Sequence, residues 1–164
     1  MVKLIRAGLM SAVMVVMMCG GVFAQETFVP QGSTLVPYMT FWQSSKYYYW
    51  TMVSLSNVTG SDVKCRVTPY NDNGAEVPQY IEVETSTAVI GNGISEFDIP
   101  AHSTRYVRVR VKNTKKNVGG YALIEWSSTD TVARRALLGG VRTNGYSWEG
   151  PLGGEYLLNN GQLF

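Results

Sequence analysis

Residues 46–57 read KYYYWTMVSLSN, a stretch in which three tyrosines and a tryptophan follow one another. Successive side chains of an extended chain point to opposite faces, so alternate residues share a face. Val53 shares one face with Tyr47, and we expect this face to turn toward a hydrophobic core because a leucine follows Val53 on it. Tyr48 and Trp50 fall on the opposite face.

Two interpretations of the outward-facing rings remain open. Aromatic side chains are common on strands because they pack well there, so Tyr48 and Trp50 can form an ordinary aromatic ladder. Alternatively, they contact a sugar ring or a partner protein, together with Tyr38, Trp42 and Trp148. A contiguous exposed aromatic patch would favour the second interpretation, because soluble monomers rarely expose one without a use.

The rest of the chain also predicts strands. Residues 81–84, 105–112 and 121–126 alternate between apolar and polar side chains or form short apolar runs, and clusters of Gly, Asn, Asp and Pro separate them. Short strands joined by such turns indicate an all-β protein, a single antiparallel β-sandwich. Residues 131–142 (TVARRALLGGVR) are ambiguous between helix and strand, and their two glycines favour a strand.

The N-terminal segment has the three parts of a secretory signal peptide. A basic start and an apolar run precede the small-residue sequence VFA at 22–24. The apolar run is shorter than the ~20 residues that a membrane-spanning helix needs. We therefore expect residues 1–24 to be removed and the chain to be exported by a bacterial-type route to the periplasm, the cell surface or the medium. Lipidation at Cys19 is disfavoured, because the residue before it is large.

Export changes the charge balance. The chain has 14 basic and 12 acidic residues, and two of the basic residues lie in the first 24, so the remaining 140 residues are near neutral. A chain without a basic excess is a poor nucleic-acid binder. Cys65 is then the one remaining cysteine; it is either a small buried apolar side chain or half of an intermolecular disulfide. Its place on an apolar strand face favours burial.

Catalytic and metal-binding residues are scarce. His102 is the one histidine and sits in a turn, and Ser103 beside it would point to the opposite face of a strand. The sequence around Asp72 lacks the full calcium-loop pattern, and its Asn-Gly pair favours a hairpin turn. We therefore expect no enzyme activity, no cofactor and no metal. Asn57-Val58-Thr59 matches a glycosylation acceptor.

Four charges alternate with apolar residues on two predicted strands. Glu82 and Glu84 lie on one strand, and Arg108 and Arg110 on another. They form a cross-strand ladder if the strands are neighbours, or they block unwanted pairing if the strands are edges. The simplest expectation is an exposed, solvated charged face.

The C-terminal segment, 143–164, is rich in glycine yet carries many large apolar side chains. Disordered tails usually lack such residues. We therefore divide the chain into the signal peptide, a sandwich domain at 25–142, and this segment, which docks on its own sandwich or on that of a neighbouring subunit.

The stretch SLSNVTGSDVKCRVTPYNDNG, followed by FDIPAHSTRYVRV, resembles secreted bacterial Ig-like β-sandwich domains of cell-surface and extracellular proteins. The resemblance covers about residues 50–112. The positions that carry it are Asn57, Val63, Val67, Tyr70, Asp72, Gly74, Ile99, Pro100 and Thr104. It implies an accessory, structural or adhesive role and transfers no catalytic residue.

The sequence thus predicts a non-enzymatic exported structural or interaction protein that can self-assemble. The expected partner is a protein, either another copy or a surface component. The alternative is a carbohydrate-binding module that recognises a polysaccharide through exposed aromatic residues. No membrane span is expected after signal cleavage, and a small hydrolase is disfavoured by the single histidine.

Overall fold

The computed structural model describes residues 28–44, 47–110 and 117–164. The predicted signal peptide, Cys19 and Val111 lie outside these residues. Within them the chain forms ten strands and two short 3-10 turns. The strands are β1 (Gly32–Gln43), β2 (Tyr47–Asn57), β3 (Val63–Asn71), β4 (Ile81–Glu84), β5 (Val89–Asn92), β6 (Glu96–Ile99), β7 (Thr104–Val109), β8 (Val118–Ser128), β9 (Leu137–Ser147) and β10 (Gly150–Leu157). The 3-10 turns are η2 (Pro78–Tyr80) and η3 (Leu158–Gly161).

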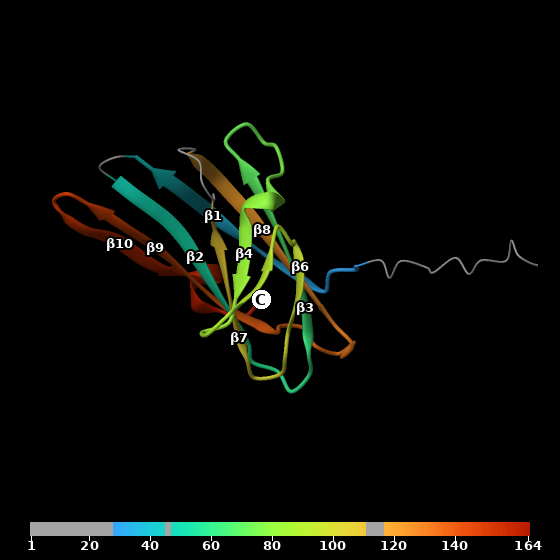
Figure 1. The fold of residues 1–164 in the computed structure, drawn as a ribbon. Coiled ribbons are helices and arrows are strands. Elements are labelled where there is room, and N and C mark those ends of the chain that lie inside the picture. Colours follow the sequence, from blue (N-terminus) through green and yellow to red (C-terminus); the bar gives the residue numbers. More distant parts are fainter. Residues whose placement is uncertain (1–27, 45–46, 111–116) are drawn as a thin grey trace, which may run out of the picture.

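All ten strands belong to one hydrogen-bonded sheet (Figure 1), and every pairing within it is antiparallel. The order is β5-β4-β7-β2-β1-β8-β3-β6, with β9 paired to β2 and β10 paired to β9. This confirms the predicted all-β antiparallel class. The strands predicted at 81–84 and 121–126 are present as β4 and within β8, and the described part of 105–112 lies largely in β7.

β2 is the strand at which the sheet divides. One of its edges pairs with β9 along the whole of β2. Its other edge pairs first with β1, at positions 48–50, and then with β7, at positions 52–56. β1 therefore leaves β2 early and continues beside β8. The sheet therefore has two arms. The first arm, β5-β4-β7-β2-β9-β10, contains β2, and the second arm, β1-β8-β3-β6, branches from β2 through β1.

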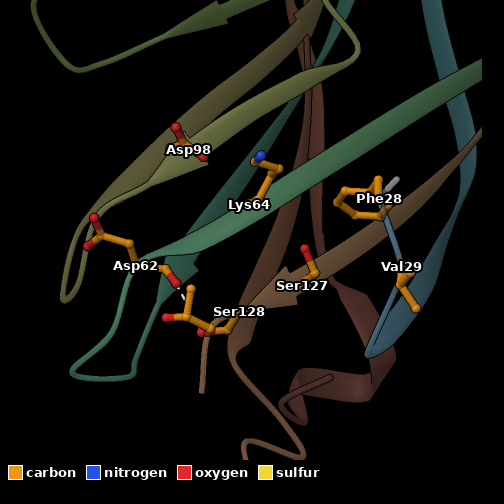
Figure 2. A pocket seen from close by; sticks show the side chains of 8 residues that line it. Phe28, Val29, Asp62, Lys64, Asp98, Ser127 and Ser128 are labelled. Atoms are coloured by element: carbon orange, nitrogen blue, oxygen red, sulfur yellow. Dashed lines mark hydrogen bonds between the residues drawn. The ribbon is translucent and has the colours of Figure 1, made fainter. Parts of the chain in front are cut away.

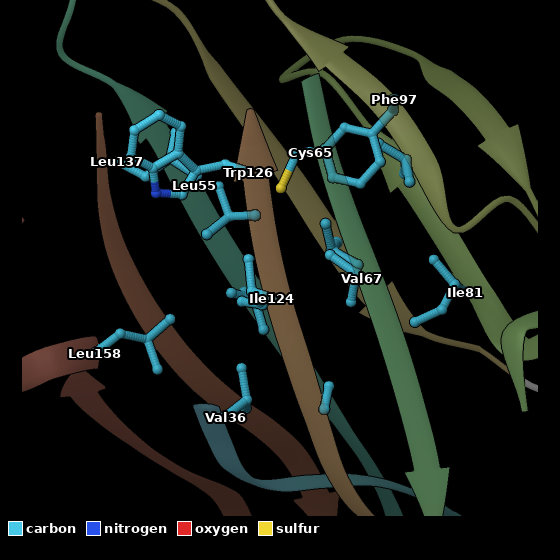
Figure 3. Close-up of a cluster of buried hydrophobic side chains, with 14 of the residues drawn as sticks. Val36, Leu55, Cys65, Val67, Ile81, Phe97, Ile124, Trp126, Leu137 and Leu158 are labelled. Carbon is cyan, nitrogen blue, oxygen red and sulfur yellow. The ribbon is translucent and has the colours of Figure 1, made fainter. Parts of the chain in front are cut away.

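The two arms enclose a single hydrophobic core (Figure 3). Alternate residues of β2 are buried, as the sequence predicted for Val53, and the neighbouring strands β7 and β4 add further valines and isoleucines. The second arm contributes Trp126, Ile124 and Cys65 from the facing side. Each fully buried side chain of this size contributes about 1.5–3 kcal/mol, so the core holds the curled sheet closed.

The C-terminal segment docks on its own chain. Leu158 and Phe164 belong to the core, and the Phe164 carbonyl accepts hydrogen bonds from the Ala136 and Leu137 amides, both at 3.0 Å. The boundary that we drew between 142 and 143 falls inside β9. The strand predicted at 131–142 begins only at Leu137, and the residues before it form turns rather than a helix.

Candidate functional site

The residues flagged for catalysis or modification, His102 and Asn57, lie in different surroundings. His102 is exposed in the turn before β7 with a φ of 55°. The Nδ2 group of Asn57 donates to the carbonyls of Ser61, Ile99 and Pro100 at 2.8, 3.0 and 3.2 Å. Because Asn57 is only 2% exposed, its amide is not accessible to an enzyme acting on the folded chain.

Cys65 is a free, fully buried cysteine on β3. Burial raises the pKa of its thiol far above the ordinary value, and the nearby Glu125 carboxylate adds to the effect. Across the described residues, no group of three or more His, Cys, Asp or Glu side chains is placed to hold a metal ion. No helix in that same part of the chain is long and apolar enough to cross a membrane.

The sequence around Asp72 forms a tight turn. The Asn71 side chain accepts hydrogen bonds from the Asn73 and Ala75 amides at 3.0 and 2.9 Å, and Gly74 adopts a φ of 77°. One isolated bridge closes the turn rather than a full hairpin ladder. The chain then crosses from β3, in the second arm, to β4, in the first.

Most of the exposed aromatic side chains that the sequence flagged lie at one end of the molecule, where two hairpins run side by side. The β1–β2 hairpin ends next to the β9–β10 hairpin, because Tyr47 is opposite Ser147 and Tyr48 is opposite Tyr146. The exposed aromatic residues of these two ends are Trp42, Tyr47, Tyr48, Tyr146 and Trp148. We call this group the aromatic tip. Figure 1 shows both hairpins extending to the same side of the molecule.

The rings of the β1–β2 hairpin lie on both faces of the sheet. Tyr48 contacts Phe41 edge-to-face, with ring centroids 5.6 Å apart. The rings of Tyr48 and Trp50 have centroids 4.9 Å apart and are inclined to each other by 41°. Trp42 and Tyr47 form a second pair, with centroids 6.4 Å apart and planes inclined by 36°. The tip therefore offers aromatic surface in two directions rather than one flat platform.

Two of the five predicted contact residues lie outside this tip. Trp50 is partly buried and packs against the core, so its role is mixed. Tyr38 is exposed in the irregular part of β1 between Val36 and Met39, and its backbone forms a hydrogen bond to the Tyr156 hydroxyl. That hydrogen bond opposes the upward shift of the Tyr156 pKa that burial causes.

The outer face of β2, β9 and β10 is hollowed. Two adjoining hollows of about 390 and 410 Å³ share Arg142 and Glu155, which form an ion pair at 3.1 Å. We call them together the β9–β10 groove. Its lining side chains include Trp50, Met52, Tyr106, Arg142, Asn144 and Glu155.

The charged face of β4 and β7 is a ladder between neighbouring strands. Arg108 pairs with Glu84, and Arg110 pairs with Glu82 at 3.0 Å. The expectation of a solvated face is wrong for Glu82, which is 2% exposed. Burial raises the pKa of Glu84, a hydrogen bond with Glu82 adds to this, and Arg108 partly offsets it. The hydrogen bond that Arg110 donates to Glu82 raises the pKa of Arg110.

A cavity of about 500 Å³ lies on the second arm (Figure 2). Phe28 and Val29 border it beside β3 and β8, and Asp62, Lys64 and Asp98 are its charged lining residues. The Asp62 carboxylate accepts a hydrogen bond from the Ala101 amide at 3.0 Å, so it is engaged in holding a turn. Ser127, Ser128 and Thr129 complete its lining.

Prediction from the sequence did not assign several residues to these surfaces. Tyr47 was assigned to the core face, but it is exposed because β2 extends beyond the core at its start. Tyr146 was treated only as part of a docking tail, although its spacing of two from Trp148 was a usable signal. Arg142 and Glu155 carry no local signal, since they meet only through the pairing of β9 with β10.

Comparisons with known proteins find little. No protein-family model matches this chain. No curated protein matches it either. Among solved structures, one described as "Complete structure of manganese lipoxygenase of Gaeumannomyces graminis and partial structure of zonadhesin of Komagataella pastoris" is similar at 9% identity with a TM-score of 0.29. The match covers 84% of this chain and 48% of that one, so this chain spans about half its length. A likeness this weak identifies neither fold nor function.

Proposed function

We propose that this chain is an exported, non-enzymatic Ig-like β-sandwich protein that makes protein–protein contacts at the cell surface or in the periplasm, with a second copy of itself as the first partner. The observation that carries the proposal is the aromatic tip. Tyr146 and Trp148 are 64% and 70% exposed, and neither belongs to the core. Tyr and Trp are the residues most enriched where protein interfaces concentrate their binding energy.

The free edge of β10 supports the same proposal. β10 pairs only with β9, so one row of its backbone groups has no strand partner within the described sheet. Unpaired edges of this kind are templates for strand addition by another chain. Pro151 is compatible with such an edge, because proline lacks the amide that a central strand would use.

The Ig-like part of the proposal rests on how the chain encloses its core. Two arms of antiparallel strands face each other across one hydrophobic cluster. Residues that carry the resemblance also meet in space: the Asn57 side chain, at the end of β2, bonds the carbonyls of Ile99 and Pro100 before β7. This contact joins the end of β2, in the first arm, to the end of β6, in the second.

A sugar platform built from the rings of the aromatic tip is less well supported. Stacking on an extended polysaccharide favours coplanar rings on one face, flanked by hydrogen-bonding groups. In the tip, the rings of Trp42 and Tyr47 are inclined by 36°, and Tyr48, on the other face, is inclined by 41° to the adjacent Trp50. A surface of this shape fits a protein partner that encloses it.

The test is light scattering coupled to size-exclusion chromatography of the full-length chain, collected from a secreting host, over a range of concentrations. We expect a mass that rises with concentration. The double variant Tyr146→Ser/Trp148→Ser should remain monomeric at the same concentrations. Val132→Ser is the matched control, because Val132 is an exposed apolar residue in the turn before β9, outside the tip.

A wild-type chain that stays monomeric throughout would contradict self-association. Equal association of the wild type and the double variant would remove the aromatic tip from the proposal. The mass of the same collected protein tests export: we expect the chain to begin at Gln25, and a retained Met1 would contradict cleavage.

A further inference from the structure

The β9–β10 groove is an open, mixed-polarity hollow that the proposed function does not use. It follows β9 from Gly140 to Gly145, a length of about 17 Å at the usual strand rise. Its two parts, about 390 and 410 Å³, fall in the size range of small-ligand sites. An elongated ligand that lies along β9 would contact both parts.

The walls of the groove are aromatic at two points. Trp50 borders one part and Tyr106 borders the other. Both belong to the outer face of the first arm, because Trp50 is opposite Asn144 and Tyr106 is opposite Ser54. Indole and phenol rings offer flat apolar surfaces on which the C–H face of a sugar ring packs.

The centre of the groove carries a donor and an acceptor side by side. Arg142 and Glu155 are 3.1 Å apart and are 58% and 69% exposed, so their mutual attraction is screened and contributes little to stability. A ligand can therefore share both groups at small cost. A hydroxyl group donates to the carboxylate and accepts from the guanidinium, whereas a free anion would be repelled by Glu155 and a cation by Arg142.

We infer that the β9–β10 groove binds a neutral oligosaccharide, with its sugar rings against Trp50 and Tyr106 and its hydroxyls hydrogen-bonded to Arg142, Glu155 and Asn144. The paired charges leave the groove without a net charge, which selects a polyol over a charged chain. The inference does not rest on the self-association proposed above, since the aromatic tip and the groove use different side chains.

The experiment is a titration of the full-length chain, followed by NMR shifts or calorimetry, with pentasaccharides of glucose, xylose and mannose at up to about 10 mM. A galacturonic acid oligomer is the anionic probe. Glu155→Gln replaces the carboxylate acceptor by an uncharged amide, and Asn144→Ala removes a hydrogen-bonding side chain from the groove. Glu96→Gln is the matched control, because Glu96 forms a similar exposed ion pair with Arg66 on the second arm.

We expect at least one neutral pentasaccharide to bind, and we expect each groove variant to weaken its binding by about tenfold or more, about 1.4 kcal/mol. Glu96→Gln and the double variant Tyr146→Ser/Trp148→Ser should bind like the wild type, which separates this inference from the proposed function. No binding of any neutral probe, stronger binding of the anionic oligomer, or equal weakening by Glu155→Gln and Glu96→Gln would each overturn it.

Discussion

At the scale of single residues, Asn57 links the end of β2 to the turn between β6 and β7. Its Nδ2 group donates to three carbonyls, and its Oδ1 accepts from the Thr59 amide and hydroxyl at 2.9 and 2.8 Å. A buried polar group that loses its partner costs about 1–3 kcal/mol. The glycosylation motif at this position therefore coincides with a structural requirement for an asparagine.

We expect Asn57→Ala to lower the free energy of unfolding by about 2–4 kcal/mol, because several buried carbonyls and amides lose their partner at once. Urea unfolding followed by circular dichroism measures the change. Asn73→Ala, in an exposed turn, is the control and should change stability by less than about 0.5 kcal/mol. Similar values for the two variants would contradict the role assigned to Asn57.

Glu84 predicts a pH effect at the same scale. Burial raises its pKa above the ordinary value of 4.5, so in the pH range between 4.5 and the raised pKa the folded state binds more protons than the unfolded state. Stability from this group is present below 4.5 and is lost as pH rises through the raised pKa.

Thermal unfolding from below pH 4.5 to neutral pH tests this effect. Glu84→Gln cannot titrate, so we expect its melting temperature to decline less over this range than that of the wild type. Glu149→Gln, an exposed residue at the β9–β10 turn, controls for the loss of one negative charge. Parallel curves for the wild type and Glu84→Gln would count against the assignment.

At the scale of strands, the start of β8 shows how closely β3 and β8 approach. Gly120 has a φ of 156°, and a Cβ atom there would lie 1.9 Å from the Tyr70 carbonyl oxygen. Its neighbour Gly119 has no atom within 4 Å of the corresponding position. Two adjacent glycines thus have different roles: the backbone contact between β3 and β8 needs the first, and the second is open to substitution.

Alanine substitutions at Gly120 and Gly119 can be compared directly, because the two glycines are adjacent in the same strand. We expect Gly120→Ala to destabilise the chain by about 2 kcal/mol or more, because the strands must move apart to admit the methyl group. Gly119→Ala should change stability by less than about 1 kcal/mol. Denaturant unfolding of the two variants gives the comparison, and equal stabilities would show that β3 and β8 are not in close contact at this point.

At the scale of the whole molecule, one core links strands that are far apart in the sequence. Cys65 lies inside it, with residues of both arms in the same cluster (Figure 3). A thiol reagent can reach its sulfur only when the two arms separate, because Cys65 is fully buried. Burial also raises the pKa of the thiol, so little of the reactive thiolate forms in the folded chain.

We expect Cys65 to resist a thiol reagent in the native chain and to react at a rate that follows unfolding as urea is added. The measurement is labelling with Ellman's reagent in a Cys19→Ser background, so that one thiol remains. A surface variant, Ser33→Cys on β1, is the positive control because residue 33 is exposed. Fast labelling of Cys65 without denaturant would contradict its burial and would reopen the intermolecular disulfide.

The candidate surfaces were only partly predictable. Tyr48 was flagged because its place on an outward face is visible in the alternation of the chain, and Trp42 and Trp148 were flagged as large aromatic side chains without a face assigned to them. That they gather with Tyr146 was not visible, because the gathering depends on the register between β2 and β9. The groove was hidden for the same reason: Arg142 and Glu155 lie on different strands, and no local pattern pairs them.

By itself, the sequence predicted the antiparallel all-β class, the strands at 81–84 and 121–126, and the inward face of the chain at Val53 and Cys65. Alternation and turn chemistry act between neighbouring residues, so Val53, Val107 and Cys65 reveal their burial locally. Only the tertiary structure decided that β2 is shared between two arms, that Glu82 is buried, and that the C-terminal Phe164 closes the core of its own chain. These features depend on contacts between distant segments, whose energies are set by packing and pairing that no local pattern records.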